Sequence, residues 1–291
     1  MSELACVWEL GAVLGEGPVW HEPDSALYFV DILGRRIHRF RPSDGDKRSW
    51  DAPARPTFIV PTAQGDFLCG FSDGLRRFDP SAGGFGTLRP VEPDQPGNRL
   101  NDGHVGADGR LWFGTMHDEE TEGTGSLYSL DSHDAPFVRH DTGYVVSNGP
   151  AIDPERGRLY HNDSARRTIY CFDLAADGSL GNRRVFARTE RGYPDGIALD
   201  EEGALWVALF RGHGVVRYAP DGSELQRVEF PCANVTKMAF IGPDRRTALV
   251  TTARKTLSDA ELAEQPLAGG LFSFTVPVAG QAPGVFGLRS I

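Results

Sequence analysis

Four side chains that carry carboxylate or carboxamide oxygens recur along the chain at nearly constant spacing: Glu16, Asn101, Asn148 and Asp195. Threonines at positions 57 and 236 complete the series, in which the steps range from 41 residues (16 to 57) to 47 residues (101 to 148). Carboxylate and carboxamide oxygens are hard ligands that suit Ca²⁺, Mg²⁺ or Mn²⁺. The series therefore predicts a divalent-cation site, provided that the fold brings these positions together.

The glycines that follow three of these residues also allow a plainer interpretation, because Asn-Gly and Asp-Gly pairs commonly form hairpin turns. The segments concerned are Asn101-Asp102-Gly103, Asn148-Gly149 and Asp195-Gly196. Each repeat, however, has a turn signal farther on, at Asp108-Gly109, at 155–157 and at 201–203. We therefore predict that the three segments precede strands, and that their glycines let the backbone closely approach a channel at the centre of the fold.

Short apolar and aromatic runs repeat with the same period and predict the strands that position these residues. The central run of each repeat is found at Ala26–Val30, Asp66–Gly70, Arg110–Gly114, Arg158–His161, Ala204–Ala208 and Thr247–Thr251. A period of about 40–50 residues with several strands per repeat is typical of propeller blades. The sequence predicts an all-β fold, a six-bladed β-propeller with four-stranded blades, as a single domain over residues 1–291.

The ends of the repeat series carry two further predictions. We expect Cys6–Leu10 to pair with the C-terminal blade and close the ring, since closure removes exposed sheet edges. The best helical candidate, Ser258–Gln265, falls in a loop inside the last blade. A WD-type repeat is disfavoured because Trp50-Asp51 does not recur once per blade.

Composition excludes several classes of function. The 291 residues carry a formal charge of -10 with interspersed charges, which argues against nucleic-acid binding. No apolar stretch approaches the roughly 18 residues of a membrane span, and the first residues are not expected to form a signal peptide. The four cysteines have no CxxC spacing, so reduced thiols and a cytoplasmic setting are expected. GxSxG, Walker and HExxH patterns are absent from the sequence.

Other polar residues surround the predicted cation site. Arg99 lies two positions before Asn101, where it could hold substrate oxygens. Loops at 117–119, 161–163 and 211–213 follow neighbouring strands, and either surface loops or substrate contacts would explain them. The tryptophans at 20, 112 and 206 lie in mid-strand, which favours core packing.

Five motifs, in order and at blade spacing, resemble the gluconolactonase/regucalcin (senescence marker protein) family. They are Leu14–Trp20, Asn98–Gly103, Gly109–Met116, Ser147–Pro150 and Tyr193–Gly196. Two C-terminal segments, Thr251–Arg254 and Pro266–Gly270, are similar to bacterial aldonolactonases such as xylonolactonase or gluconolactonase. The resemblance runs from Leu14 to Phe274 and implies a six-bladed propeller with one divalent metal.

The resemblance also implies roles for particular residues. Glu16, Asn148 and Asp195 would be the protein ligands of the metal, which in this family is Ca, Mg, Mn, Zn or Fe. Asp195 would also be the catalytic acid/base. Substrate would contact Arg99, Asn101 and an acidic residue, which falls on Glu119 with Asp118 as the alternative.

The implied activity is metal-dependent hydrolysis of a sugar lactone to the aldonic acid. The metal would polarise the carbonyl and activate a bound water, whose proton Asp195 would take and return to the leaving alkoxide. The alternatives are a broad esterase or phosphotriesterase, a non-catalytic calcium-binding regulator and a purely structural scaffold. The expected partner is a small-molecule sugar lactone, with no nucleic acid or membrane, and the protein is expected to be a monomer or a weak oligomer.

Overall fold

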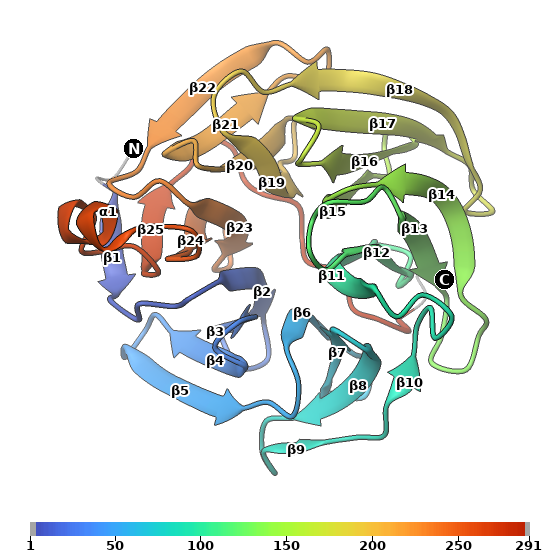
Figure 1. Ribbon diagram of the computed structural model, residues 1–291, viewed down its shortest axis with the longest axis horizontal. Coiled ribbons are helices and arrows are strands. Elements are labelled where there is room, and N and C mark those ends of the chain that lie inside the picture. Colours follow the sequence, from blue (N-terminus) through green and yellow to red (C-terminus); the bar gives the residue numbers. More distant parts are fainter. Residues whose placement is uncertain (1–3, 289–291) are drawn as a thin grey trace. The chain divides into compact units, whose positions relative to one another are not determined.

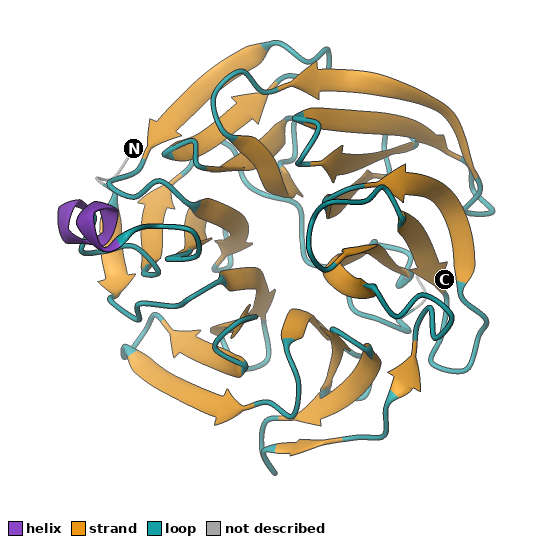
Figure 2. Cartoon of the chain, viewed as in Figure 1, coloured by secondary structure: helices purple, strands orange, loops and turns teal. Residues whose placement is uncertain are grey.

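Six antiparallel sheets follow one another along the chain in the computed structural model, which describes residues 4–288. The all-β, six-bladed β-propeller predicted from the sequence is confirmed (Figures 1 and 2). The predicted domain also includes residues 1–3 and 289–291, which lie outside the described residues. Those described form two compact units, 4–56 with Glu190–Ala282 and Thr57–Thr189 with 283–288, and each unit is described by itself. A single domain therefore stays a prediction.

The first unit contains three sheets. Two of them have strands in chain order: β2 (Gly15–His21), β3 (Ala26–Asp31), β4 (Arg36–Arg41) and β5 (Asp46–Asp51), then β19 (Tyr193–Leu199), β20 (Leu205–Phe210), β21 (Gly214–Tyr218) and β22 (Glu224–Glu229). The third contains β23 (Val235–Ile241), β24 (Thr247–Thr252), β25 (Leu271–Thr275) and β1 (Ala5–Trp8). The N-terminal strand β1 pairs antiparallel with β25, as predicted (Figure 1).

The second unit also contains three sheets. One holds β6 (Pro56–Pro61), β7 (Phe67–Phe71) and β8 (Gly74–Asp79), with the short strands β9 (Gly84–Phe85) and β10 (Arg89–Pro90) both pairing with β8. The next holds β11 (Asn98–Val105), β12 (Leu111–His117), β13 (Gly125–Leu130) and β14 (Val138–Tyr144). The last holds β15 (Ser147–Asp153), β16 (Arg158–Asp163), β17 (Thr168–Leu174) and β18 (Leu180–Arg188).

The helix α1 (Asp259–Glu264) lies between β24 and β25. Ser258 caps it, and the Ser258 and Glu261 side chains form a reciprocal capping box, which satisfies backbone N–H groups at the helix start. The helix therefore lies inside the last blade, at the segment the sequence indicated. Among the described residues, no helix is long and apolar enough to cross a membrane.

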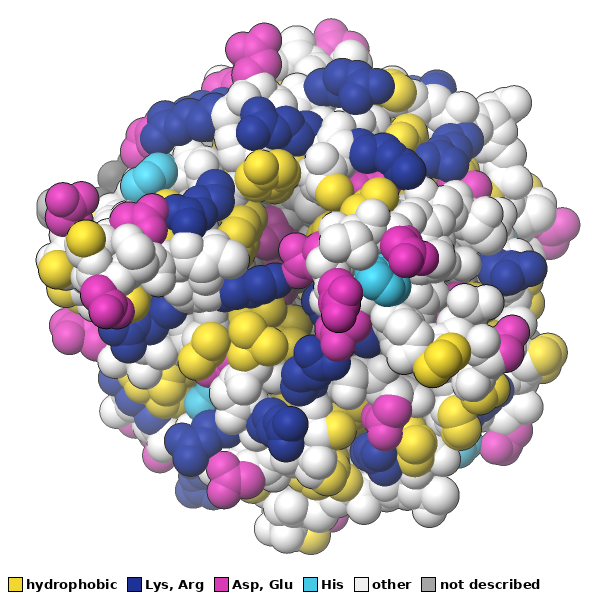
Figure 3. Space-filling view, in the orientation of Figure 1, with side chains coloured by type: hydrophobic (Ala, Val, Ile, Leu, Met, Phe, Trp, Pro, Cys, Tyr) yellow, Lys and Arg dark blue, Asp and Glu magenta, His cyan; other side chains and the backbone are white. Residues whose placement is uncertain are grey.

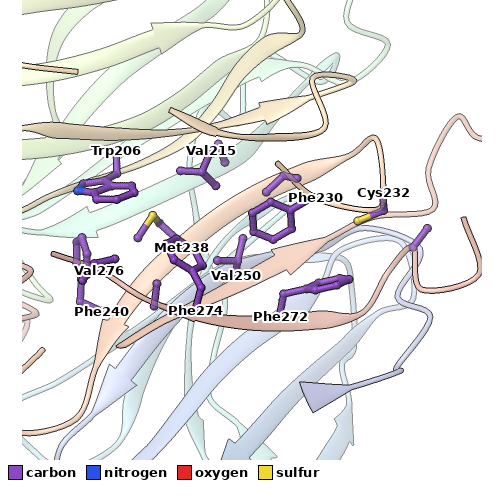
Figure 4. Packing of buried hydrophobic residues seen from close by; sticks show 14 residues of the cluster. Trp206, Val215, Phe230, Cys232, Met238, Phe240, Val250, Phe272, Phe274 and Val276 are labelled. Carbon is purple, nitrogen blue, oxygen red and sulfur yellow. The ribbon is translucent and has the colours of Figure 1, made fainter. Parts of the chain in front are cut away.

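Apolar side chains from neighbouring sheets of one unit pack into a shared core. In the first unit, Trp206 and Val215 of one sheet meet Met238, Val250 and Phe272 of the next (Figure 4). Second strands such as β3 and β7 are buried along their whole length, because both faces are covered. The tryptophans at 20, 112 and 206 are all buried, so the prediction that they pack in the core is confirmed.

A β-bulge interrupts the pairing of first and second strands in each blade that carries one of the four oxygen-bearing candidates, and a further bulge lies at Thr236 in β23. The register gains one residue at Gly17-Pro18, Asn101-Asp102, Gly149-Pro150 and Asp195-Gly196. The hairpin turns lie downstream, between first and second strands, so the hairpin interpretation of these segments is wrong. The candidate residues, however, lie inside the first strands and not before them, because pairing extends past each bulge. Bulges occur often beside active sites, where they re-aim side chains.

Candidate active site

The second unit brings Arg99, Asn101 and Asn148 into one buried chain of hydrogen bonds. Arg99 Nη1 donates to Asn101 Oδ1 at 2.6 Å. Asn101 Nδ2 donates both to the Ser147 carbonyl and to Asn148 Oδ1, each at 2.8 Å. Asn148 Nδ2 in turn donates to Ser164 Oγ at 2.8 Å. We call these four side chains, Arg99, Asn101, Asn148 and Ser164, the amide relay.

Asp118 holds the outer end of the amide relay. Its Oδ1 accepts a hydrogen bond from Arg99 Nε at 2.9 Å, and its side chain is 38% exposed against 6% for Arg99. The neighbouring Glu119 is exposed. Of the two predicted acidic contacts, the structure therefore places Asp118 against Arg99 and leaves Glu119 facing solvent.

A second carboxylate, Asp102, joins two bulged strands beneath the relay. It is buried, and its Oδ1 accepts the Gly103 N–H at 2.7 Å. Its Oδ2 accepts the Gly149 N–H at 3.1 Å. The Asp102 side chain, directly after Asn101, thus binds the backbone N–H of Gly149, directly after Asn148, and this bond fixes the spacing of β11 and β15.

Glu92 anchors the loop that leads into Arg99. Its carboxylate accepts hydrogen bonds from Asn98 Nδ2 at 2.8 Å, Thr115 Oγ1 at 3.1 Å and Tyr128 Oη at 2.7 Å. Burial, together with the hydrogen bond to Glu92, raises the pKa of Tyr128 to about 12. The phenol therefore stays protonated and donates at neutral pH. Asn98, held in this way, immediately precedes Arg99 in β11.

The segment 161–163 is buried, so the surface-loop alternative is wrong for it. His161 is 0% exposed, and burial lowers its pKa to about 3. It pairs with Ser147 Oγ at 2.9 Å, and a β-carbon at Gly114 would lie 1.8 Å from that hydroxyl. Asp163 accepts the Val145 N–H at 3.1 Å, which holds the turn ahead of β15.

The loop 211–213 is likewise tied down by protein contacts. Arg211 donates to the Glu261 carboxylate and to the Thr256 carbonyl, which attaches the loop to the α1 segment. Arg211 and His213 both adopt positive φ, at 58° and 56°. The Arg211 side chain is therefore held by hydrogen bonds within the first unit.

The first unit carries the two predicted carboxylate ligands. Glu16 and Asp195 are 6% and 5% exposed, and both lie at bulges, in β2 and β19. Gly196 must remain small, because a β-carbon there would lie 2.3 Å from Cγ of Lys237, whose stem crosses it. Glu16 Oε2 accepts the Gly17 N–H at 2.9 Å.

The chemistry of these donors fits a hard divalent cation. A buried carboxylate needs hydrogen bonds or a cation to offset its lost hydration. The Asn148 carboxamide oxygen has two lone pairs, of which Asn101 occupies one. Within residues 4–288, no group of three or more His, Cys, Asp or Glu side chains is arranged so that it could hold a metal ion.

Sequence reasoning identified the relay residues Arg99, Asn101 and Asn148 but missed Ser164, Ser147 and Glu92. Ser164 directly follows β16, whose Asn162 pairs in register with Asn148. Counting two residues beyond Asn162 would have found Ser164, but only with the strand register known.

Figure 3 shows Lys and Arg side chains interspersed with Asp and Glu over the face in view.

Comparisons with known proteins extend over nearly the whole chain. Residues 14–254 match the SMP-30/gluconolactonase/LRE-like family. The 6-deoxy-6-sulfogluconolactonase of Pseudomonas putida is 37% identical over 288 residues, covering 97% of this chain and 98% of that protein. The L-arabinolactonase of Azospirillum brasilense is 38% identical over 280 residues, covering 94% and 92%.

A solved structure supports the same family. The crystal structure of regucalcin, a calcium-binding protein from Agrobacterium tumefaciens, has a TM-score of 0.91 at 29% sequence identity and 97% coverage of both chains. The resemblance inferred from the five sequence motifs is therefore confirmed. The chain belongs to the SMP-30/gluconolactonase/LRE-like family.

Proposed function

We propose that this protein is a sugar lactonase that hydrolyses an aldonolactone to the aldonic acid, with Glu16, Asn148 and Asp195 holding one divalent cation. Membership in a family whose relatives include a sulfogluconolactonase and an arabinolactonase supports the reaction class. The observation that carries the proposal is the amide relay, which aligns an arginine and two asparagines within the bulged strands β11 and β15. The similar structure of regucalcin, which is described as a calcium-binding protein, supports a divalent cation.

The cation would polarise the lactone carbonyl and increase the acidity of a water molecule. Asp195 has two carboxylate oxygens, so one can serve as a ligand while the other takes the proton of the attacking water. The same carboxyl group can then return that proton to the ring oxygen as the ester bond breaks. No covalent intermediate on the protein is required, because a lactone is an activated ester.

Arg99 and Asn101 would bind and orient the sugar. The guanidinium group can only donate hydrogen bonds, which suits hydroxyl and carbonyl oxygens. Its partner Asp118, beside the outer end of the relay, is more exposed than Arg99, so substrate would approach Arg99 from that side. We propose that Asp118 orients Arg99 and that Glu119, which faces solvent, contacts a sugar hydroxyl.

Four cysteines without a disulfide are consistent with the proposed cytoplasmic setting. Cys69 and Cys232 are both buried, and burial raises the pKa of the Cys232 thiol to about 12. These thiols therefore remain protonated and pack as small apolar groups. They supply no nucleophile to the proposed reaction.

The test begins with removal of metal by a chelator and restoration of single cations: Ca²⁺, Mg²⁺, Mn²⁺, Zn²⁺ or Fe²⁺. Acid release is then followed for a panel of five- and six-membered aldonolactones, with protein-free samples containing the same cation as controls. We expect at least one cation to restore ring opening well above the spontaneous rate. If no lactone opens faster than background with any cation, the enzyme proposal fails.

A calcium-binding regulator is the second candidate, and the structural similarity to regucalcin, a calcium-binding protein, is the observation in its favour. Calcium binding measured by calorimetry without hydrolysis of any lactone would support that candidate. An aryl ester and a phosphotriester added to the panel separate a broad esterase from a lactonase. Preference for these two substrates over every lactone would favour the esterase.

A further inference from the structure

The amide relay has only one possible polarity. The Arg99 guanidinium donates and cannot accept, and its Nη1 lies 2.6 Å from Asn101 Oδ1. The Ser147 carbonyl accepts and cannot donate, and it lies 2.8 Å from Asn101 Nδ2. These two partners determine which end of the Asn101 carboxamide is oxygen and which is nitrogen.

The orientation of Asn101 determines that of Asn148. Asn101 Nδ2 is a donor 2.8 Å from the Asn148 carboxamide, so the atom facing it must be Oδ1. Asn148 Nδ2 then faces Ser164 Oγ at 2.8 Å, where the hydroxyl accepts. A half-turn of the Asn148 amide would set two donors against each other, at a cost of about 0.5–1.5 kcal/mol for each hydrogen bond lost.

Burial keeps water from replacing these partners. Arg99, Asn101, Asn148 and Ser164 are all buried, and Ser147 is fully enclosed. A buried amide group without its partner pays the cost of desolvation, so the relay is stable when complete and costly when broken. The polarity is therefore a fixed property of the folded chain.

We propose that Ser164 and Arg99 are positioning residues, which turn the oxygen of the Asn148 carboxamide, and not its nitrogen, toward the metal. This inference rests on the proposed function, in which Asn148 is a ligand. An amide oxygen coordinates a hard cation, whereas an amide NH₂ group repels it. Ser164 acts by holding the nitrogen of Asn148, and Arg99 acts through Asn101 by holding the oxygen side.

Metal affinity tests the inference without any measurement of turnover. Metal-free protein is titrated with Ca²⁺ or Mn²⁺ in competition with a chromophoric chelator, and the dissociation constants are compared. Loss of such an orienting partner typically weakens metal binding by about 10-fold to 100-fold, and we expect this for Ser164→Ala. Ser164→Thr retains the hydroxyl and should bind within about threefold of wild type.

Arg99→Met gives a test in which charge and positioning act in opposite directions. Removing a nearby positive charge strengthens cation binding if only electrostatics acts. Loss of the relay polarity weakens cation binding, and we expect this second effect to be the larger one. Should Ser164→Ala fail to fold, as judged by its melting curve, Arg99→Met and Ser164→Thr still decide the question.

Ser129→Ala is the matched control. Ser129 is a buried serine in the same unit, and its hydroxyl pairs with His140 Nε2 at 2.8 Å, so its loss removes one comparable hydrogen bond. Metal affinity should match wild type in this variant. Wild-type affinity in Ser164→Ala, or unchanged or tighter binding in Arg99→Met, overturns the inference while the proposed function stands. A wild-type protein that binds no divalent cation overturns the proposed metal site, and the inference with it.

Discussion

Asp102 accepts the backbone N–H of Gly149 through Oδ2, at 3.1 Å, and so joins the bulges of β11 and β15. Its other oxygen accepts the N–H of Gly103 within its own strand. Asn101 lies two positions before Gly103, and Asn148 lies one position before Gly149. Both asparagines belong to the amide relay. One buried carboxylate therefore sets the distance between two blades' contributions to the candidate site.

Asp102→Asn should destabilise the protein and impair lactone hydrolysis. The substitution replaces one acceptor oxygen with an NH₂ group that faces a backbone N–H, whichever way the amide turns. We expect a loss of about 1–3 kcal/mol in the free energy of unfolding, measured by urea denaturation. Asp108→Asn is the control, because Asp108 accepts the Arg110 N–H in an exposed hairpin. Equal stability of the two variants would contradict a stabilising role for the Asp102–Gly149 hydrogen bond.

Asp195→Asn should retain the fold and lose turnover. The amide keeps one oxygen for the cation but cannot accept a proton from water at neutral pH. Loss of a general base typically lowers kcat by about 10²–10⁴-fold, and we expect a fall in this range. Asp221→Asn changes an exposed turn carboxylate in the same unit and should leave kcat unaltered. Turnover close to wild type in Asp195→Asn would place the base elsewhere.

The spacing of polar residues in the sequence predicted the blades and the positions of Glu16, Asn101, Asn148 and Asp195, because each blade repeats one structural unit. It placed these residues ahead of their strands, whereas they lie inside β2, β11, β15 and β19. The reason is that a strand's first residue depends on how far pairing with the next strand extends past a bulge. That pairing is a tertiary property, which local composition does not encode.

Ser164 shows a second limit of sequence reasoning. A single serine after a strand has no distinctive pattern, and its role depends on the β15–β16 register and on the rotamer of Asn148. His161 and Asp163 illustrate the reverse case, since their residue types suggested chemistry. The fold buries both, and Asp163 accepts backbone N–H groups ahead of β15.

The pair Asp118→Asn and Glu119→Gln separates the two acidic residues of the 117–119 loop. Loss of the Asp118 charge weakens a partly exposed pair with Arg99, worth about 0.2–1 kcal/mol. KM should therefore rise by up to about fivefold, with kcat nearly unchanged. Glu119→Gln should raise KM only for lactones that carry the hydroxyl it contacts. A larger effect on kcat than on KM in Asp118→Asn would show that Arg99 acts in the transition state and not in substrate binding.

Stability should fall as the pH drops below about 6.5, because two histidines are buried in neutral form. Burial lowers the pKa of His38 to about 4 and that of His161 to about 3, from 6.5. The unfolded chain takes up protons first, so the stability that these groups contribute is complete above pH 6.5 and is lost as the pH falls toward 4 and 3. Urea midpoints at pH 7.5, 6.0 and 5.0 measure this loss. His38→Gln should flatten the decline, whereas His133→Gln removes an exposed imidazole as the control. A wild-type slope in His38→Gln would assign the pH dependence to other groups.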